Sequence, residues 1–344
     1  IDDAFVLFRR RVEVLRASNR MEGMQHRIRM SGLPCCVEPW VGACLSEHKQ
    51  GILTRSEFES LWHDKAIDTT PSLTFDVAWQ MLVVLAGKSE KVVDMKILRY
   101  RLGASRPPAE FCTADVGTGG PILSTIHASK GREADVVCLM LPQISSANND
   151  ASEETRVAFV GATRARKSLS VGKGYISKTY YTKNSRRAYT LWGSNRRLSA
   201  FVEIGRDGDI TAEGVAGKKY FSTTDDVQQS QNRLKKIAYD NTGIYGVRDP
   251  SAGYAYRIDE CRSGSRYIAA LSQKVNADLF EIRNKHFHFL KLPAGLSKLH
   301  VIAIRTIVLP PDHHELMLLH NPWSQSGIML APVVIGMPLI KYSR

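Results

Sequence analysis

The segment Ser124–Val137, with the sequence STIHASKGREADVV, decides how the rest of the chain is interpreted. It joins two apolar runs, Ile122–Ile126 and Asp135–Leu141, which are typical of buried strands in a parallel sheet. Between them it gathers hydroxyls, an imidazole, a cation and a carboxylate beside a glycine. Loops at the carboxyl ends of parallel strands bind ligands, and such donors suit phosphates. The segment therefore predicts an α/β sheet with a ligand-binding loop.

A second segment, Glu153–Arg166, reads EETRVAFVGATRAR and predicts a helix. Two carboxylates fall in its first turn, where the helix dipole favours negative charge. The helix delivers Arg164 near its end, and a fixed guanidinium can stabilise the charge of a transferring phosphoryl group. Taken alone, Arg164 would be an ordinary surface cation.

The chain around these segments continues the α/β pattern. Ala4–Phe8 predicts a buried strand, a helical stretch follows, and Cys35–Val37 predicts a further strand. Ser46–Arg106 shows helical spacing instead and predicts a helical insertion, whereas Lys167–Val171 alternates like a strand. We therefore expect a first domain at 1–199 with a parallel sheet and a helical insertion at about 46–106.

Beyond residue 200 the pattern changes to short apolar runs separated by turn residues. This pattern predicts a smaller, mainly β accessory domain over 200–344. A length of 344 residues agrees with two domains rather than one.

The charge balance favours a polyanionic partner, because the formal net charge is +13 at pH 7. From Arg164 to Arg197 the chain has many Lys and Arg residues and no Asp or Glu, with tyrosines and a tryptophan interleaved. Cations neutralise phosphates and flat rings stack on bases, so the tract predicts a single-strand groove. A solvated basic face beside an ordinary aromatic core is the alternative.

Membrane, secretory and metal-binding classes are not favoured. The longest apolar stretch, Gly327–Ile340, is too short to span a bilayer and contains two prolines, and Asp2 and Asp3 stand where a signal peptide carries positive charge. The six cysteines form no C-x-x-C pair. The histidine pairs His286/His288 and His313/His314 lack further ligands. We therefore expect a cytoplasmic protein, or a piece of one, without a metal site.

The two opening segments resemble a known family. The pattern T-x-H-x-S-K-G-x-E-x-D-x-V, followed by E-E-x-R-x-x-F-V-G-x-T-R-A, resembles motifs V and VI of UvrD/Rep/PcrA-like superfamily 1 DNA helicases. Val6–Arg9 is similar to motif IV. The resemblance covers roughly residues 1–172, the second RecA-like (P-loop NTPase-type) domain of such enzymes. It places the 46–106 insertion where those enzymes have their 2B subdomain.

The resemblance implies an ATP-binding role for four residues. Arg164 would be the arginine finger that reaches the γ-phosphate, and Arg9 would be a second contact to the same phosphate. Glu133 would approach the ATP ribose, beside Gly131. Arg132 stands where the family usually has leucine, which leaves the local packing open.

The resemblance also implies a DNA-binding role for Thr125, His127 and Lys130, which would lie toward the single strand or couple it to the nucleotide. Together with the basic tract, the predicted DNA-binding set adds Lys173, Arg186, Arg187, Arg196 and Arg197.

Half of an ATPase is missing from the sequence. There is no G-x-x-x-x-G-K-[ST] loop and no acidic magnesium pair, and Gly87–Ser89 is preceded by Leu82 where the first glycine of such a loop would stand. We expect ATP and Mg²⁺ to be held mainly by an N-terminal RecA-like domain of the same protein, so that this chain is inactive alone. The partner would be single-stranded DNA or a single-strand/duplex junction, with a nuclease or DNA repair protein as a further partner. A non-catalytic nucleic-acid-binding or protein-recruiting module with the helicase fold is the alternative.

Overall fold

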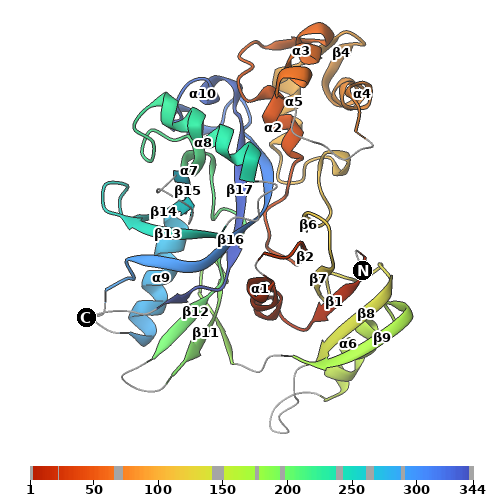
Figure 1. Cartoon of the computed structure of the whole chain (residues 1–344). Coiled ribbons are helices and arrows are strands. Elements are labelled where there is room, and N and C mark those ends of the chain that lie inside the picture. The colour runs from red at the N-terminus through yellow and green to blue at the C-terminus, as the bar shows by residue number, and fades with distance from the viewer. Residues whose placement is uncertain are drawn as a thin grey trace.

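The computed structural model contains a parallel sheet, a helical insertion and a second unit rich in strands (Figure 1). It describes residues 3–21, 23–65, 73–141, 151–174, 178–193, 198–237, 243–260, 267–287 and 291–340.

The parallel sheet confirms the expected α/β class. Its order is β6-β2-β7-β1-β8-β9, in which β6 alone runs antiparallel to its neighbour. Helix α1 (Arg11–Arg20) and helix α6 (Ala151–Ala162) cover opposite faces. Phe8 packs with the α1 cluster while Phe5 and Leu7 pack toward α6, because successive side chains of a strand point to opposite faces. The strands are β1 (Phe5–Phe8), β2 (Arg27–Arg29), β6 (Val116–Gly117), β7 (Ile122–Thr125), β8 (Ala134–Leu141) and β9 (Ala165–Lys173).

The insertion between β2 and β6 is helical, and it also holds a small antiparallel sheet of order β3-β5-β4. Trp40, Phe58 and Trp79 form the centre of its core. Gly87–Ser89 is the exposed strand β4 of that sheet rather than a loop leading into a helix. The elements are α2 (Pro39–Leu45), β3 (Ile52–Thr54), α3 (Arg55–Lys65), α4 (Phe75–Ala86), β4 (Gly87–Ser89), β5 (Val92–Asp94), α5 (Met95–Leu102) and the 3₁₀ turn η1 (Ala109–Phe111).

The second unit contains two antiparallel sheets, β10-β11-β12-β18 and β15-β14-β13-β16-β17. Both β10 and β11 precede residue 200 yet pair into the first of these sheets, so the unit begins near Thr179 in the structure. Its strands are β10 (Thr179–Tyr181), β11 (Ala188–Trp192), β12 (Ser199–Val202), β13 (Gly243–Asp249), β14 (Ala255–Glu260), β15 (Tyr267–Ala270), β16 (Gly295–Val308), β17 (Ile328–Gly336) and β18 (Leu339–Ile340). Its helices are α7 (Ala212–Ala216), α8 (Thr224–Ile237), α9 (Gln273–His286), η3 (His314–Leu318) and α10 (Trp323–Ser326).

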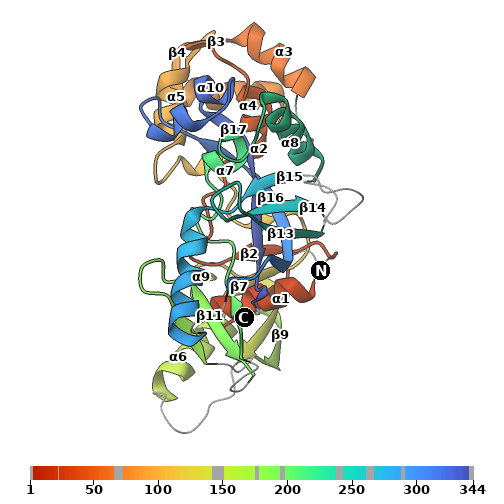
Figure 2. The same ribbon diagram turned by 90° about the vertical axis from the view of Figure 1, so that its left-hand side faces the viewer.

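The two units share hydrophobic cores rather than meeting at a polar boundary. Ile302 of β16 and Val333 of β17 belong to the same buried cluster as Val12 of α1. Val308 and Ile328 join the core of the insertion. The long strands β16 and β17 accordingly lie in the middle of the molecule in both ribbon views (Figures 1 and 2). Residues from both sides of position 200 therefore contribute to the same buried clusters, and the division into two domains at that position stays a prediction.

Among the described helices, none is long and apolar enough to cross a bilayer.

Candidate nucleotide and nucleic-acid site

The loop between β7 and β8 is a tight turn that begins at Thr125. The Thr125 carbonyl accepts hydrogen bonds from the backbone N–H groups of Ala128 at 3.0 Å and Ser129 at 3.1 Å. The Ser129 hydroxyl donates back to the carbonyl of Ile126 at 2.8 Å. Gly131 has a φ of +79°, a conformation that favours glycine. This framework leaves the side chains of His127 and Lys130 exposed to solvent.

The end of this loop is fixed by a shared carboxylate. Asp115 accepts from Arg132 and from Arg29, each at 2.8 Å. Arg29 also donates to the carbonyl of Ala128 at 3.0 Å. The residue that departs from the family's leucine, Arg132, thus positions the loop through an ion pair instead of apolar packing.

Arg164 lies directly after α6 and folds back over the end of that helix. Its guanidinium donates to the Val160 carbonyl at 2.9 Å, the Arg132 carbonyl at 3.3 Å and the Thr163 hydroxyl at 3.1 Å. All three acceptors are neutral, so these contacts orient the guanidinium without neutralising its charge. Glu133 and Gly131 are exposed next to Arg132. The predicted ATP-binding residues Gly131, Glu133 and Arg164 are therefore neighbours where β8 and β9 begin.

Arg9 lies at the other end of α6. Its guanidinium forms ion pairs with Glu153 at 3.1 Å and Glu154 at 3.0 Å, both in the first turn of the helix. Arg164 follows the last turn, so the helix separates the two arginines by roughly 15 Å. Arg9 and Arg164 thus lie at opposite ends of a helix of 12 residues in this structure, and their binding to one phosphate stays a prediction.

Arg9 instead borders a hollow of about 640 Å³ at the carboxyl ends of β1 and β7. Five arginines and two glutamates are among the lining residues, which gives the hollow a positive balance suited to an anion. We call it the basic groove. Its lining residues are Arg9, Arg10, Arg11, Ser31, Thr125, His127, Glu153, Glu154, Tyr181, Arg186 and Arg206.

Some of the residues predicted to bind DNA lie together in the basic groove. Thr125, His127 and Arg186 line it together, although Arg186 belongs to the second unit. Lys130 and Lys173 are exposed but are not among its lining residues. Arg196 and Arg197 lie outside the described residues.

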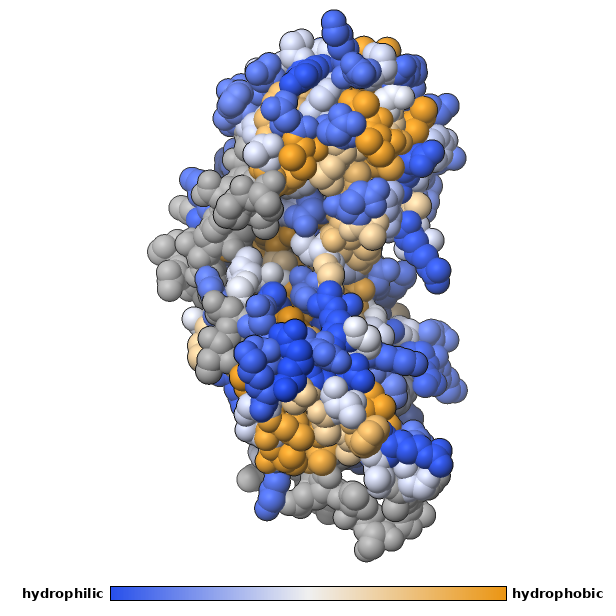
Figure 3. Space-filling view, turned by 90° about the vertical axis from the view of Figure 1, so that its right-hand side faces the viewer, coloured by the Kyte–Doolittle hydropathy of each residue, from blue (hydrophilic) through white to orange (hydrophobic). Residues whose placement is uncertain are grey.

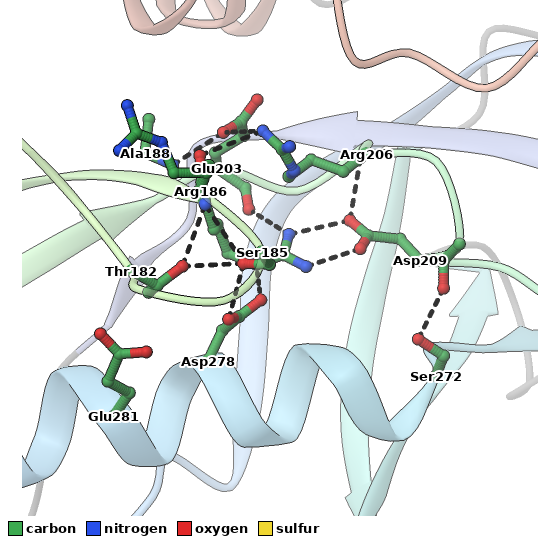
Figure 4. Close-up of polar contacts among 12 residues, drawn as sticks. Thr182, Ser185, Arg186, Ala188, Glu203, Arg206, Asp209, Ser272, Asp278 and Glu281 are labelled. Carbon is green, nitrogen blue, oxygen red and sulfur yellow. Dashed lines mark hydrogen bonds and ion pairs between the residues drawn. The ribbon is translucent and has the colours of Figure 1, made fainter.

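Arg187 is a structural residue, which corrects its predicted role in DNA binding. Its side chain is only 1 % exposed. It donates to Asp278 at 2.7 Å, to Asp209 at 2.6 and 2.9 Å, and to the Glu203 carbonyl at 2.7 Å (Figure 4). Burial alone would lower the pKa of Arg187, but the charges of Asp209 and Asp278 more than offset this and raise it. No part of its guanidinium is available to a ligand.

Sequence reasoning missed Arg10, Arg11 and Arg206 as groove residues. Arg10 and Arg11 could have been predicted from the sequence, because they continue the run of arginines after β1. Arg206 could not have been predicted, because the fold of the second unit brings it to the groove. Within the described residues, no cluster of His, Cys, Asp or Glu is arranged to hold a metal ion.

An apolar surface is exposed on the side of the molecule where β8 and β9 lie (Figure 3). Leu169 and Val171 of β9 are exposed on the face of the sheet that carries α6, and Phe159 of α6 is 68 % exposed; Val136 of β8 is exposed on the opposite face. Exposed apolar patches of this kind often mark contact surfaces.

Comparison with known proteins agrees with the geometry. Residues 121–174 match the model of the UvrD-like helicase C-terminal domain, a segment that holds β7, β8, α6 and β9. The match confirms, over this segment, the resemblance to UvrD-like helicases inferred from motifs V and VI. Neither the curated proteins nor the solved structures contain a significant match to the chain.

Proposed function

We propose that this chain is the C-terminal half of an ATP-dependent superfamily 1A DNA helicase. Its parallel sheet is the second RecA-like domain, and an N-terminal RecA-like domain of the same protein supplies the rest of the ATP site. ATP hydrolysis in the cleft between the two domains drives translocation on single-stranded DNA and duplex unwinding. Such a protein acts in the cytoplasm at single-strand/duplex junctions, with a nuclease or DNA repair protein as partner.

One observation supports the proposal most directly: two rigid connections join the Arg164 end of the sheet to the basic groove. The loop after β7 runs from Thr125 and His127 in the groove to Gly131 and Glu133 beside Arg164. Helix α6 runs from its ion pairs with Arg9 to Arg164. A shift of either element at one end therefore moves the other end, which is the coupling that a motor needs.

At the nucleotide end, Arg164 supplies a guanidinium that is oriented but not neutralised. The neighbouring carboxylate of Glu133 is exposed and can accept from a ribose hydroxyl. ATP and Mg²⁺ fit this donor set only in part, because the described residues provide no carboxylate cluster for the metal. An N-terminal domain would hold Mg²⁺, which would offset the negative charge of the phosphates, and Arg164 of this chain would add positive charge at the γ-phosphate.

At the groove end, cationic side chains neutralise a phosphate backbone, and the Thr125 and His127 side chains offer hydrogen bonds to it. The apolar surface with Phe159, Leu169 and Val171 is the face that we assign to the contact with the N-terminal domain. β9 begins directly after Arg164, so a domain seated there lies next to the finger.

The test is Arg164→Ala in the complete protein that includes the N-terminal domain. We expect kcat for ATP hydrolysis to fall by about 10³-fold or more, with nucleotide affinity nearly unchanged, because a finger acts on transition-state charge. Arg166→Ala is the matched control, since Arg166 is exposed and paired with Asp135 at 2.7 Å. Equal loss of binding and hydrolysis, or full activity of Arg164→Ala, would count against the finger and favour a non-catalytic module.

A further inference from the structure

We infer that the hairpin β10–β11 and Arg206 form the second wall of the basic groove, where Tyr181 stacks on a base of single-stranded DNA. Arg186 and Arg206 hold the phosphates on either side of that base. The inference rests on the proposed function, and it assigns part of the DNA site to the second unit, which resembles no family named above.

The first support is the convergence of distant segments. Tyr181, Arg186 and Arg206 line the same hollow as Thr125 and His127. The two walls are tied together, since the Arg186 carbonyl accepts from Arg206 at 3.2 Å and from Arg11, just after β1, at 3.4 Å. The hairpin is thus held against the sheet rather than projecting into solvent.

The second support is the orientation of Tyr181. Neighbouring residues of a strand face opposite ways, and Tyr180 stacks inward on Tyr189 with ring centroids 5.5 Å apart. Tyr181 therefore faces outward, and its side chain is 43 % exposed. The Arg186 guanidinium lies over its ring at 5.3 Å from the centroid. An exposed ring beside a cation is the pair of groups that single-strand sites use for a base and its phosphate.

The third support is a rigid turn. Arg186 has a φ of +56°, which a non-glycine residue adopts only when its surroundings impose it. Those surroundings are dense: the Ser185 hydroxyl donates to Asp278 at 2.7 Å (Figure 4). The Lys183 backbone N–H donates to Glu281 at 2.9 Å. The residue that follows Arg186 in the chain, Arg187, is buried and held by its hydrogen bonds to Asp278 and Asp209. A preorganised turn loses little conformational entropy when it binds a ligand.

The charge pattern favours a nucleic acid strand over a small anion. Arg9, Arg11 and Arg206 are paired with carboxylates, Arg206 with Glu203 at 3.5 Å, whereas Arg186 pairs with none among the described residues. A free phosphate would contact the arginines but would make no stacking contact with Tyr181. A ligand that carries both a base and phosphates contacts Tyr181 and the arginines together.

The experiment compares two probes by fluorescence anisotropy: a short oligothymidylate and an abasic strand of the same length. Tyr181→Ala is expected to weaken oligothymidylate binding about tenfold and abasic binding by less than about twofold, because only stacking is lost. Arg186→Ala should weaken both probes and reduce the slope of log affinity against log salt by about 0.7.

Tyr254→Ala is the matched control. Tyr254 is 52 % exposed and lies under Arg248 at 4.7 Å, but it does not line the groove. Tyr181→Phe should bind like the unchanged protein. If the unchanged protein does not bind oligothymidylate, the proposed function fails. If it binds and Tyr181→Ala is unaffected, or loses both probes equally, only the inference is overturned.

Discussion

At the scale of single residues, Arg186 and Arg187 are adjacent and have opposite roles. Arg186 is exposed at the turn, whereas Arg187 points inward to Asp209 and Asp278, which are 22 and 91 positions away in the chain. A basic tract in a sequence shows how many cations it contains but not which of them meet a buried carboxylate. This is why the predicted DNA-binding set included Arg187.

Removing the Arg187 side chain is expected to destabilise the protein strongly. Arg187→Ala leaves two buried carboxylates without their cation, which should lower the free energy of unfolding by about 3–5 kcal/mol. Urea unfolding followed by circular dichroism measures the change.

The neighbouring Arg186→Ala is the natural control and should change that free energy by less than about 0.5 kcal/mol, because Arg186 is exposed. Equal stability of the two variants would show that the buried ion pairs do not hold the hairpin.

The positions of the two predicted catalytic arginines, Arg9 and Arg164, also depend on contacts between distant parts of the chain. The role of each follows from a short motif that resembles the helicase family, and such local motifs do not specify the distance between Arg9 and Arg164. The ion pairs of Arg9 with the start of α6 are what fix the separation.

At the scale of elements, the best predictions concern segments whose structure is determined locally. The strands at β7 and β8 and the helix that leads to Arg164 follow from short patterns of apolar residues and from the two carboxylates in the first turn of the helix. The insertion was predicted as helical, but its small sheet was not, because β3, β4 and β5 have only three residues each. Such short strands carry too little periodicity to be recognised.

Strand β4 leads to a prediction about Gly87–Ser89. Lys88 is exposed and pairs with Asp94 at 2.9 Å. The hydrogen bond from Lys88 lowers the pKa of Asp94, which also caps α5 through the N–H groups of Lys96 and Ile97. Lys88→Ala should therefore leave ATP affinity and kcat in the complete protein unchanged within about twofold, unlike loss of a phosphate-binding lysine.

Nucleotide titration and steady-state hydrolysis of Lys88→Ala check this, with Lys91→Ala on the adjoining turn as control. A large loss confined to Lys88→Ala would reopen the question of a phosphate-binding loop in the insertion.

At the scale of the whole molecule, the α/β class could be predicted, but the joint between the units could not. The apolar runs of β16 and β17 indicated strands, yet nothing in them shows that Ile302 and Val333 pack beside α1. Contacts between segments so far apart depend on the complete fold. The groove wall supplied by Tyr181 and Arg206 was hidden for the same reason.

A buried polar cluster at this joint predicts sensitivity to acid. Ser18 of α1 hydrogen-bonds to His26 at 2.7 Å and to His300 of β16 at 2.8 Å. Burial lowers the pKa of both histidines, that of His300 from 6.5 to about 4. Both are therefore neutral in the folded protein, whereas the unfolded chain binds protons below about pH 6.5. Stability is complete above that pH and declines as the pH falls toward 4.

At about pH 5 the contribution of His300 alone should lower the free energy of unfolding by up to about 2 kcal/mol. Urea unfolding at about pH 7.5 and pH 5 measures the loss. His300→Gln keeps a hydrogen-bonding side chain that does not titrate. The free energy of unfolding of this variant should therefore fall by up to about 2 kcal/mol less between the two pH values than that of the unchanged protein. An identical loss in both proteins would place the acid sensitivity elsewhere.

The shared core also bears on the evolutionary history of the protein. A module that moves between genes by recombination must bring a complete hydrophobic interior with it. An exchange near residue 200 would instead expose Val12 and Leu15 on one fragment and Ile302 and Val333 on the other. Such fragments would be poorly stable, so selection should keep the parallel sheet and the strand-rich unit together as one heritable block.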